Sequence, residues 1–373
     1  MKKKFDILVT DSRYKHSLAA VRALGKKDLK ICTMSDKFSA TSFSKYSKKN
    51  YRYKKGDFVK KILEITKNNE ISVIMPVGYE SNLLCSKKQD QIKKQSKIII
   101  ADYKTMELAS DKEKMSKFIK KNKISFPKTY IIKNIQDAKK IKFEKEMIIK
   151  SSKELKGKKV EYLKTKEELL EKVKERLKHG PQIVQEYIRG FGCGFFALCV
   201  DGKIKASFQH KRINEYPFRG GVSSLSESFY DKNLEKIGEK ILKRIKWQGI
   251  AMLEFIYDVE DKKFKFIEMN PKFWGSLDLA IESGVNFPYL YYLSATNKKY
   301  KKPKYKKGVK FQWILPEDTL RLKTADKKWT EIKKYFKNIF NKKIKKDIGY
   351  LFRDPIPTII KVGGTGFKVI FGK

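Results

Sequence analysis

Three oxygen-bearing side chains stand out near the ends of two neighbouring apolar segments. Glu254 lies in the segment M-L-E-F-I, and Glu268 and Asn270 lie in I-E-M-N, which Pro271 follows. If the two segments pair as a hairpin, these side chains can converge at one end of it. Two carboxylates and an amide oxygen are hard ligands that suit Mg²⁺ together with the phosphates of a substrate. The alternative is that both glutamates are exposed positions of half-buried strands.

Two lysines can supply positive charge to the same chemistry. Lys150 ends the apolar run M-I-I-K, a setting that a lysine avoids unless its ammonium group meets an anion. Lys112 follows Ser110 and Asp111, which predict the start of a helix, where the helix dipole favours a negative ligand. In a chain with 77 lysines, the alternative for each one taken singly is a solvated surface residue.

The segments before these residues predict an open parallel α/β sheet. Short apolar runs alternate with amphipathic helical patterns over the first hundred residues, as in such sheets. The turn after the first run contains no glycine, so the sequence excludes a G-x-G-x-x-G dinucleotide site there. The predicted strands are residues 5–10, 29–33, 71–75 and 97–101, with helices around 18–24 and 58–66.

Two hairpins with intervening helices predict an α+β region after residue 145. Asp201-Gly202 lies between two alternating runs, which is a strong hairpin signal. The acidic turn 258–262 separates the runs that carry Glu254 and Glu268 and predicts a second hairpin. The predicted strands are residues 146–150, 183–188, 195–200, 204–210, 251–257 and 264–269, with a helix over 234–245.

The composition is that of a globular chain with an extreme positive charge. It has 373 residues, of which 40% are hydrophobic, and a formal net charge of +45. Such a charge attracts nucleic acid, anionic lipid or phosphorylated metabolites. However, only 10 of the 87 basic residues are arginine, the residue whose planar fork recognises bases and phosphates. A genome whose codon usage favours lysine would place this residue at most surface positions, and this explains the charge equally well.

The sequence also argues against a membrane-spanning protein, a protein with a signal peptide and a zinc- or disulfide-stabilised protein. No run approaches the ~18 uncharged apolar residues of a spanning helix, and the start of the sequence is too short for a signal peptide, so we expect a cytoplasmic protein. The four cysteines form no C-x-x-C pair and there are only three histidines, which argues against a zinc site or a disulfide framework.

The order of these motifs resembles the ATP-grasp superfamily over residues 105–290. The motifs follow one another in a fixed order. The first are a lysine at a helix start, a lysine at a strand end and a loop with one glycine, and they are followed by the runs V-Q-E-Y-I, L-E-F and I-E-M-N. The segments FQHKRINEYPFRGGVSS and MNPKFWGSLDLAIESGVNFP are similar to the carboxylate-amine ligase type, within the group that includes biotin carboxylase and carbamoyl-phosphate synthase. The resemblance implies a pre-ATP-grasp α/β domain followed by an ATP-grasp fold of two α+β subdomains.

The resemblance also implies a reaction and a set of roles. Such an enzyme phosphorylates a carboxylate with ATP and lets an amine displace the phosphate, and some relatives accompany polysaccharide biosynthesis genes. Its cofactors would be ATP and Mg²⁺ or Mn²⁺, and its partners small-molecule carboxylates and amines, sugar- or lipid-linked ones included. The implied metal ligands are Glu254, Glu268 and Asn270; the phosphate-binding lysines are Lys112 and Lys150; the adenine hinge is Gln185, Glu186, Tyr187 and Ile188; and the phosphate lid is the loop 156–160 with Gly157.

Three cationic residues are predicted to act on the substrate. We expect Arg212 or Arg219 to hold the transferred phosphoryl group or the substrate carboxylate bidentately; the alternative is an ion pair with a nearby glutamate, Glu215 or Glu227. Lys272 stands two residues after Asn270, where the superfamily often has arginine. A lysine keeps the charge but loses the fork. Because of this departure and the single glycine of the lid, the alternative of a homologue that binds nucleotide without catalysing a reaction stays open.

We expect three successive domains. They are the pre-ATP-grasp domain at 1–105, the ATP-grasp domain at 106–296 with a lid subdomain at about 128–188, and a basic helical extension at 297–373. In the extension, apolar residues recur at helical spacing from Trp329 to Ile348 with lysines between them. This pattern is typical of a segment that contacts an anionic membrane peripherally. The alternative is a helix that packs on the protein and has lysines on its solvent-exposed side.

Two further partners are left open by the sequence. A homodimer is common among such enzymes. The charge of +45 suggests a nucleic-acid-binding protein as a second class of function, but the lysines are spread evenly and no RNA- or DNA-binding module is evident, so we expect no specific nucleic acid.

Overall fold

The structure is a computed structural model that describes residues 2–151, 160–217 and 221–371. Its internal contacts divide the chain into two compact units. The first unit contains Met1–Glu107, Gly194–Met252 and Asn270–Lys373, and the second contains Leu108–Cys193 and Leu253–Met269. The basic C-terminal residues therefore group with the N-terminal ones. The boundaries of the three predicted domains stay a prediction.

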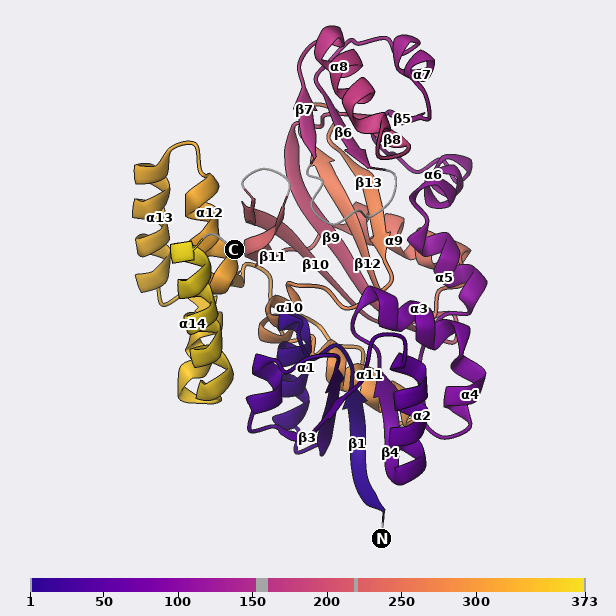
Figure 1. Cartoon of the computed structure of the whole chain (residues 1–373), viewed down its shortest axis with the longest axis vertical. Coiled ribbons are helices and arrows are strands. Elements are labelled where there is room, and N and C mark those ends of the chain that lie inside the picture. Colours follow the sequence, from indigo (N-terminus) through magenta and orange to yellow (C-terminus); the bar gives the residue numbers. More distant parts are fainter. Residues whose placement is uncertain (1, 152–159, 218–220, 372–373) are drawn as a thin grey trace. The chain divides into compact units, whose positions relative to one another are not determined.

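The N-terminal part of the first unit is a four-stranded parallel sheet in the order β3-β2-β1-β4. Its central strand β1 has the buried run Ile7, Leu8 and Val9. In the view of Figure 1, α1 and α2 lie on the two sides of this sheet. The strands are β1 (Lys3–Val9), β2 (Ile31–Ser35), β3 (Ser47–Arg52) and β4 (Asn69–Met75); the helices are α1 (Lys15–Gly25), η1 (Ala40–Phe43), α2 (Phe58–Asn68), α3 (Tyr79–Lys87), α4 (Gln89–Lys93) and α5 (Tyr103–Ser110), which leads into the second unit.

The predicted strand at 97–101 is wrong. This segment forms a single bridge between Val73 and Lys97, and the amide of Ile99, two residues further on, donates to the hydroxyl of Tyr291 at 2.9 Å instead of to a strand. The Tyr291 hydroxyl also lies 3.1 Å from the carbonyl oxygens of Ile74 and Ile99. The fourth strand of the sheet is β3, whose polar sequence S-K-K-N-Y-R fits an edge strand rather than a buried one.

A larger sheet contains both predicted hairpins. Its seven strands run in the order β13-β12-β9-β10-β11-β14-β15. Asp201 and Gly202 have positive φ values of 51° and 69°, as a tight two-residue hairpin turn requires, so the first hairpin is confirmed. The division into units falls within β9, β12 and β13. The strands are β9 (Gly190–Val200), β10 (Lys203–Tyr216), β11 (Val222–Ser228), β12 (Gly249–Asp258), β13 (Lys263–Asn270), β14 (Lys310–Gln312) and β15 (Ile344–Lys346).

Aromatic side chains form much of the core of the first unit. Phe196 packs on Trp274 with ring centroids 4.4 Å apart and on Phe208 at 5.9 Å, and Phe311 packs on Trp313 at 4.9 Å. All five are buried. The helices that follow the large sheet's strands are α9 (Lys232–Arg244), α10 (Leu277–Ser283) and α11 (Phe287–Ala295).

The second unit has an antiparallel sheet of its own in the order β5-β8-β6-β7. Apolar residues of this sheet pack against Leu169 and Val173 of α8 and Ala138 of α7, and this cluster is the unit's core. The elements are α6 (Lys112–Lys121), β5 (Thr129–Ile132), α7 (Ile135–Lys139), β6 (Met147–Ser151), β7 (Glu161–Leu163), α8 (Lys166–Leu177) and β8 (Gln182–Glu186). An open parallel α/β domain followed by α+β structure confirms the predicted fold class.

The C-terminal residues form short helices around a small apolar cluster. The predicted helical stretch ends earlier than expected, because α13 stops at Phe340 and Ile344 belongs to β15. The described helices include none that is long and apolar enough to cross a membrane. The helices are η2 (Ile314–Asp318), α12 (Thr319–Arg321), η3 (Leu322–Thr324), α13 (Lys328–Phe340), η4 (Asp347–Phe352) and α14 (Pro355–Phe371).

Candidate nucleotide and metal site

Lys150 and Gln185 meet on one face of the second unit's sheet. Lys150 on β6 lies opposite Ile183 on β8, so Gln185, two residues further along β8, points to the same face. The Nζ of Lys150 donates to Oε1 of Gln185 at 3.1 Å. The Nε2 of Gln185 donates in turn to Oγ1 of Thr129 at 2.7 Å, which fixes the orientation of the amide. A predicted phosphate lysine thus contacts a predicted hinge residue.

Both predicted carboxylates of the second unit lie near the two predicted lysines. Oε2 of Glu268 is 3.7 Å from Nζ of Lys112, and each of these side chains is about one-third exposed (31%). Lys112 is held at the start of α6 by Asp111, whose carboxylate accepts from the amides of the next residues, as the sequence predicts. Glu254 and Glu268 both act electrostatically on Lys150. Four predicted residues therefore come together within one unit.

The surroundings of Lys150 lower its affinity for a proton. Burial lowers the pKa of Lys150 to about 8, the negative charge of Glu268 opposes that effect, and the positive charge of Lys112 adds to it. Glu254 also favours the ammonium form. An anion that binds beside Lys150 favours the ammonium form and raises the lowered pKa again. Such an anion is therefore attracted more strongly to Lys150 than to a solvated lysine, whose pKa is not lowered.

The donor set fits Mg²⁺ or Mn²⁺ but does not complete a coordination shell by itself. Among the described residues, no group of three or more His, Cys, Asp and Glu stands close enough to hold a metal ion. Two carboxylates fit Mg²⁺, which commonly takes one or two protein carboxylates and fills its remaining positions with water and substrate phosphate. Asn270, the third predicted ligand, is the first residue of its segment of the first unit. Its place as a ligand stays a prediction.

The predicted hinge is already bonded through part of its backbone. The amide of Glu186 donates to the carbonyl of Lys128, and the amide of Tyr187 donates to that of Glu146, both at 2.9 Å. Ile188 is buried. An adenine bound along this segment would therefore use its other backbone groups.

An ionic cluster that the sequence analysis missed fixes Glu186. Nζ of Lys265 lies 2.7 Å from Asp258, 2.9 Å from Glu186 and 3.4 Å from Asp261. Burial alone would lower the pKa of Lys265, but its hydrogen bonds with Asp258 and Glu186 raise it above the usual value. The signal was a lysine between two buried phenylalanines in F-K-F, which is easily overlooked among 77 lysines. The cluster joins the hinge to the turn of the second hairpin.

The first unit contains two further predicted residues, Arg212 and Lys272. Nη1 of Arg212 is 3.4 Å from Oε1 of Glu215 and 3.3 Å from the carbonyl of Gly221. The ion pair considered as the alternative is thus present, and a role of Arg212 at the substrate stays a prediction. Gly221 has no room for a side chain, because a Cβ there would lie 2.0 Å from the backbone oxygen of Tyr216. The backbone of the turn itself therefore fills the space beside this glycine.

Lys272 lies in a group of cations around His16. Burial lowers the pKa of His16 to about 3, with Lys272, Lys15 and Lys361 adding to the effect in that order. His16 is therefore neutral at physiological pH. Lys15 forms an ion pair with Glu317 at 2.7 Å. The remaining predicted residues, Gly157 in the lid and Arg219, lie outside the described residues.

Comparisons with known proteins identify a domain model that matches this chain and solved structures with a similar fold. Residues 109–276 match the family model of the ATP-grasp domain. A search of curated protein sequences finds no match to this chain. The biotin carboxylase domain of Hydrogenobacter thermophilus 2-oxoglutarate carboxylase, solved with MgADP, ADP and bicarbonate, is similar to it with a TM-score of 0.65 and 16% identity, over 82% of this chain and 73% of that one.

Two other solved structures share the same fold. Biotin carboxylase from Campylobacter jejuni has a TM-score of 0.65 and 16% identity, over 81% of this chain and 74% of that one. N5-carboxyaminoimidazole synthetase from Staphylococcus aureus, solved with ADP, has a TM-score of 0.64 and 15% identity, over 82% and 81% of the two chains. The predicted resemblance is confirmed: residues 109–276 match the ATP-grasp domain model, and the chain shares the fold of biotin carboxylase and N5-carboxyaminoimidazole synthetase.

Proposed function

We propose that the protein is an ATP-dependent ligase that joins a carboxylate to an amine. The observation that carries this proposal is the gathering of Lys112, Lys150, Glu254 and Glu268 within the ATP-grasp domain. The two similar enzymes solved with ADP or MgADP support nucleotide binding by the same fold. Two cations and two carboxylates supply what a metal-bound triphosphate needs, which is neutralisation of its charge and hard oxygen ligands.

In the first half-reaction, a carboxylate oxygen of the substrate attacks the γ-phosphorus of ATP, and the bond to the β-phosphate oxygen breaks with release of ADP. Lys112 and Lys150 balance the charge that moves onto the phosphates. Glu254 and Glu268, with Asn270, would hold Mg²⁺ or Mn²⁺, and that ion supplies Lewis-acid stabilisation of the transferred phosphoryl group. The hinge from Gln185 to Ile188 would position the base.

In the second half-reaction, the amine nitrogen attacks the acyl carbon, phosphate leaves, and the nitrogen loses a proton. The acyl phosphate reacts with water, so the loop that contains Gly157 would exclude solvent during this step. The cations around Lys272 support a role of that residue at the substrate carboxylate, and Arg212 or Arg219 would hold the phosphoryl group. We further propose that the carboxylate or amine is sugar- or lipid-linked, as in polysaccharide or cell-surface biosynthesis.

The test is release of ADP and phosphate in a screen of amino acids and sugar acids as carboxylates, each paired with a pool of amines. Glu268→Gln and Glu254→Gln should each abolish turnover, because each removes a metal-binding charge. Glu260→Gln is the matched control, since Glu260 is exposed on the turn of the same hairpin. Thermal melts should show that all three variants fold.

A fully active Glu268→Gln variant would refute the metal assignment. Tight MgADP binding without turnover on any substrate pair would instead favour a nucleotide-binding homologue without catalysis. Steeply salt-sensitive binding of nucleic acid of any sequence, together with no ATP turnover, would replace the ligase by the nucleic-acid-binding alternative.

A further inference from the structure

Large apolar side chains are exposed in the C-terminal part of the first unit to an unusual extent. Of the seventeen such side chains that are exposed in the described residues, nine lie between residues 329 and 362. A water-facing surface normally scatters such side chains singly, and their concentration marks a binding surface. We call these nine residues the outer face: Trp329, Phe336, Phe340, Leu351, Phe352, Ile356, Ile359, Ile360 and Val362.

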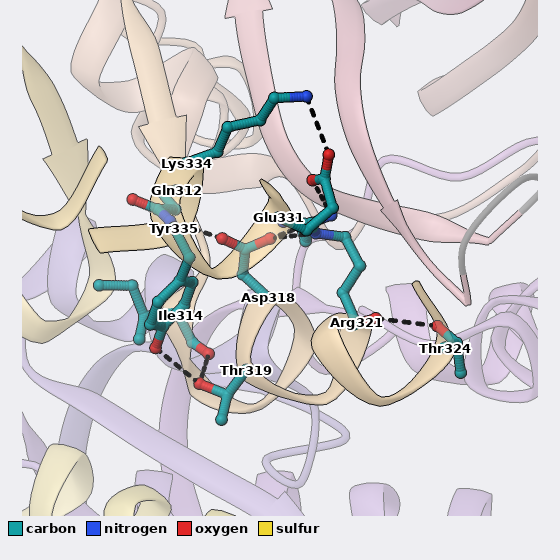
Figure 2. A network of polar contacts seen from close by, with 10 residues as sticks. Gln312, Ile314, Asp318, Thr319, Arg321, Thr324, Glu331, Lys334 and Tyr335 are labelled. Carbon is teal, nitrogen blue, oxygen red and sulfur yellow. Dashed lines mark hydrogen bonds and ion pairs between the residues drawn. The ribbon is translucent and has the colours of Figure 1, made fainter. Parts of the chain in front are cut away.

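The orientation of α13 is fixed by contacts on its inner side. Tyr335 is buried against Ile314 and Leu315, and its hydroxyl lies 3.0 Å from Oγ1 of Thr319. Glu331 forms an ion pair with Arg321 at 2.7 Å (Figure 2). The outer-face aromatic residues that lie on α13 occur at positions i, i+7 and i+11 of the helix and so form one stripe. They are Trp329, Phe336 and Phe340, exposed by 79%, 52% and 79%.

The N-terminal half of α14 has its polar side inward and its apolar side outward. Arg22 donates to the carboxylate of Asp354 at 2.8 Å and to Oγ1 of Thr358 at 3.1 Å, and both acceptor residues are buried. Ile356 and Ile359, on the other side of the helix, are more than half exposed. This is the reverse of the usual arrangement of a surface helix, in which the apolar stripe faces the core.

The charge around the outer face is mostly positive, although Asp326, three residues before Trp329, is an exposed acid. Between residues 328 and 371 the sequence has ten lysines and one arginine but three acidic residues. Each of the three is turned inward. Glu331 pairs with Arg321 and Lys334, Asp354 pairs with Arg22, and Asp347 accepts from the backbone amides of Ile314 and Leu315. Exposed lysines such as Lys333 and Lys337 lie beside the aromatic stripe on α13.

We propose that the outer face binds the surface of an anionic lipid bilayer. Such a surface offers negative headgroups to the lysines and hydrocarbon to the aromatic and isoleucine side chains. A nucleic acid would satisfy the lysines but would leave the isoleucines in water. A second copy of the chain would cover the apolar residues, but it would bring two sets of lysines together with few exposed acids to pair with them. The bilayer is the partner that matches both the charge and the apolarity.

The test is cosedimentation of the full chain with vesicles of phosphatidylcholine alone or mixed with phosphatidylglycerol. The chain should bind the anionic vesicles, and bind them more weakly at high salt. The triple variant Trp329→Ala/Phe336→Ala/Phe340→Ala should lower the partition coefficient on the order of a hundredfold. Lys333→Glu/Lys337→Glu should lower it on the order of tenfold or more.

Two matched control variants carry the same substitutions elsewhere on the first unit. Phe38→Ala/Tyr230→Ala removes exposed aromatic residues, and Lys60→Glu/Lys67→Glu reverses two exposed lysines seven residues apart on α2. Both should bind as the parent does. Deleting the C-terminal residues is a poor test, because it would also remove Asp354 from buried Arg22. Thermal melts of all variants should coincide with that of the parent.

Three results would overturn the proposal. The first is no binding to anionic vesicles. The second is equal loss of binding in the outer-face and control variants, which would indicate attraction by net charge alone. The third is a dimer in light scattering that the triple aromatic variant abolishes, without vesicle binding, which would assign the outer face to a second copy of the chain.

Discussion

The pKa of Lys150 predicts how nucleotide binding should depend on pH. Burial lowers this pKa to about 8, against a reference value of about 10.4 in water. The difference corresponds to roughly 3 kcal/mol in favour of the neutral amine. Raising the pH from 7 to 9 therefore takes the free protein from about nine-tenths to about one-tenth ammonium at this position. Since phosphate attracts only the ammonium form, the affinity for MgADP should fall roughly tenfold over that range.

The assay is calorimetric titration at pH 7, 8 and 9, with MgADP in the parent and two variants and with metal-free ADP in a third variant. Lys150→Arg keeps its charge over the whole range, so its affinity should change little with pH. Lys142→Arg, at an exposed lysine of the same unit, should keep the tenfold fall. Glu268→Gln removes an attraction that raises the pKa of Lys150, so without metal its affinity for ADP should begin to fall at a lower pH.

Two outcomes would refute the reasoning. A parent protein whose affinity for MgADP is constant from pH 7 to 9 would mean that Lys150 keeps its proton or does not contact phosphate. A Lys150→Arg variant with the same fall as the parent would assign the titration to another group.

Two buried contacts of the first unit give further predictions. Asp354→Ala leaves the buried guanidinium of Arg22 without its carboxylate and should cost about 3–5 kcal/mol of unfolding free energy in urea titrations. The apolar double variant Arg22→Met/Asp354→Leu should recover only part of it, because Ser44 and Lys45 also donate to this carboxylate. Unchanged stability of Asp354→Ala would contradict this account. Tyr291→Phe removes the acceptor of the Ile99 amide and should cost about 1–3 kcal/mol; a melt equal to that of the parent would show that another group or water replaces the hydroxyl.

The elements with strong local signals were predictable from the sequence. Asp111 before Lys112 marks the start of α6, and Asp201-Gly202 marks a hairpin, because caps and two-residue turns depend on neighbouring residues alone. The approach of Glu268 to Lys112 was also anticipated, from the order of the motifs. In each case the residues that determine the structure lie close together in the sequence or belong to a recognisable series.

Long-range contacts account for what was missed. Residues 97–101 have the composition of a buried strand, but the hydroxyl of Tyr291, nearly 200 residues later, takes the place of a neighbouring strand. The ionic cluster of Lys265 depends on Glu186, on another strand far along the chain. The strand β3 was missed because an edge strand tolerates the lysines that argue against a buried one. No local pattern reports such contacts.

The ion pair between Arg22 and Asp354 has a consequence for biosynthesis. The two residues are 332 positions apart, so α1 leaves the ribosome long before its buried guanidinium can find its partner. Until the segment around Asp354 emerges, the N-terminal part of the first unit must keep Arg22 solvated, whereas this side chain is buried in the folded protein. Emergence of this segment is then the event that lets the unit reach its final packing, and translation products that stop before it would stay exposed to proteases.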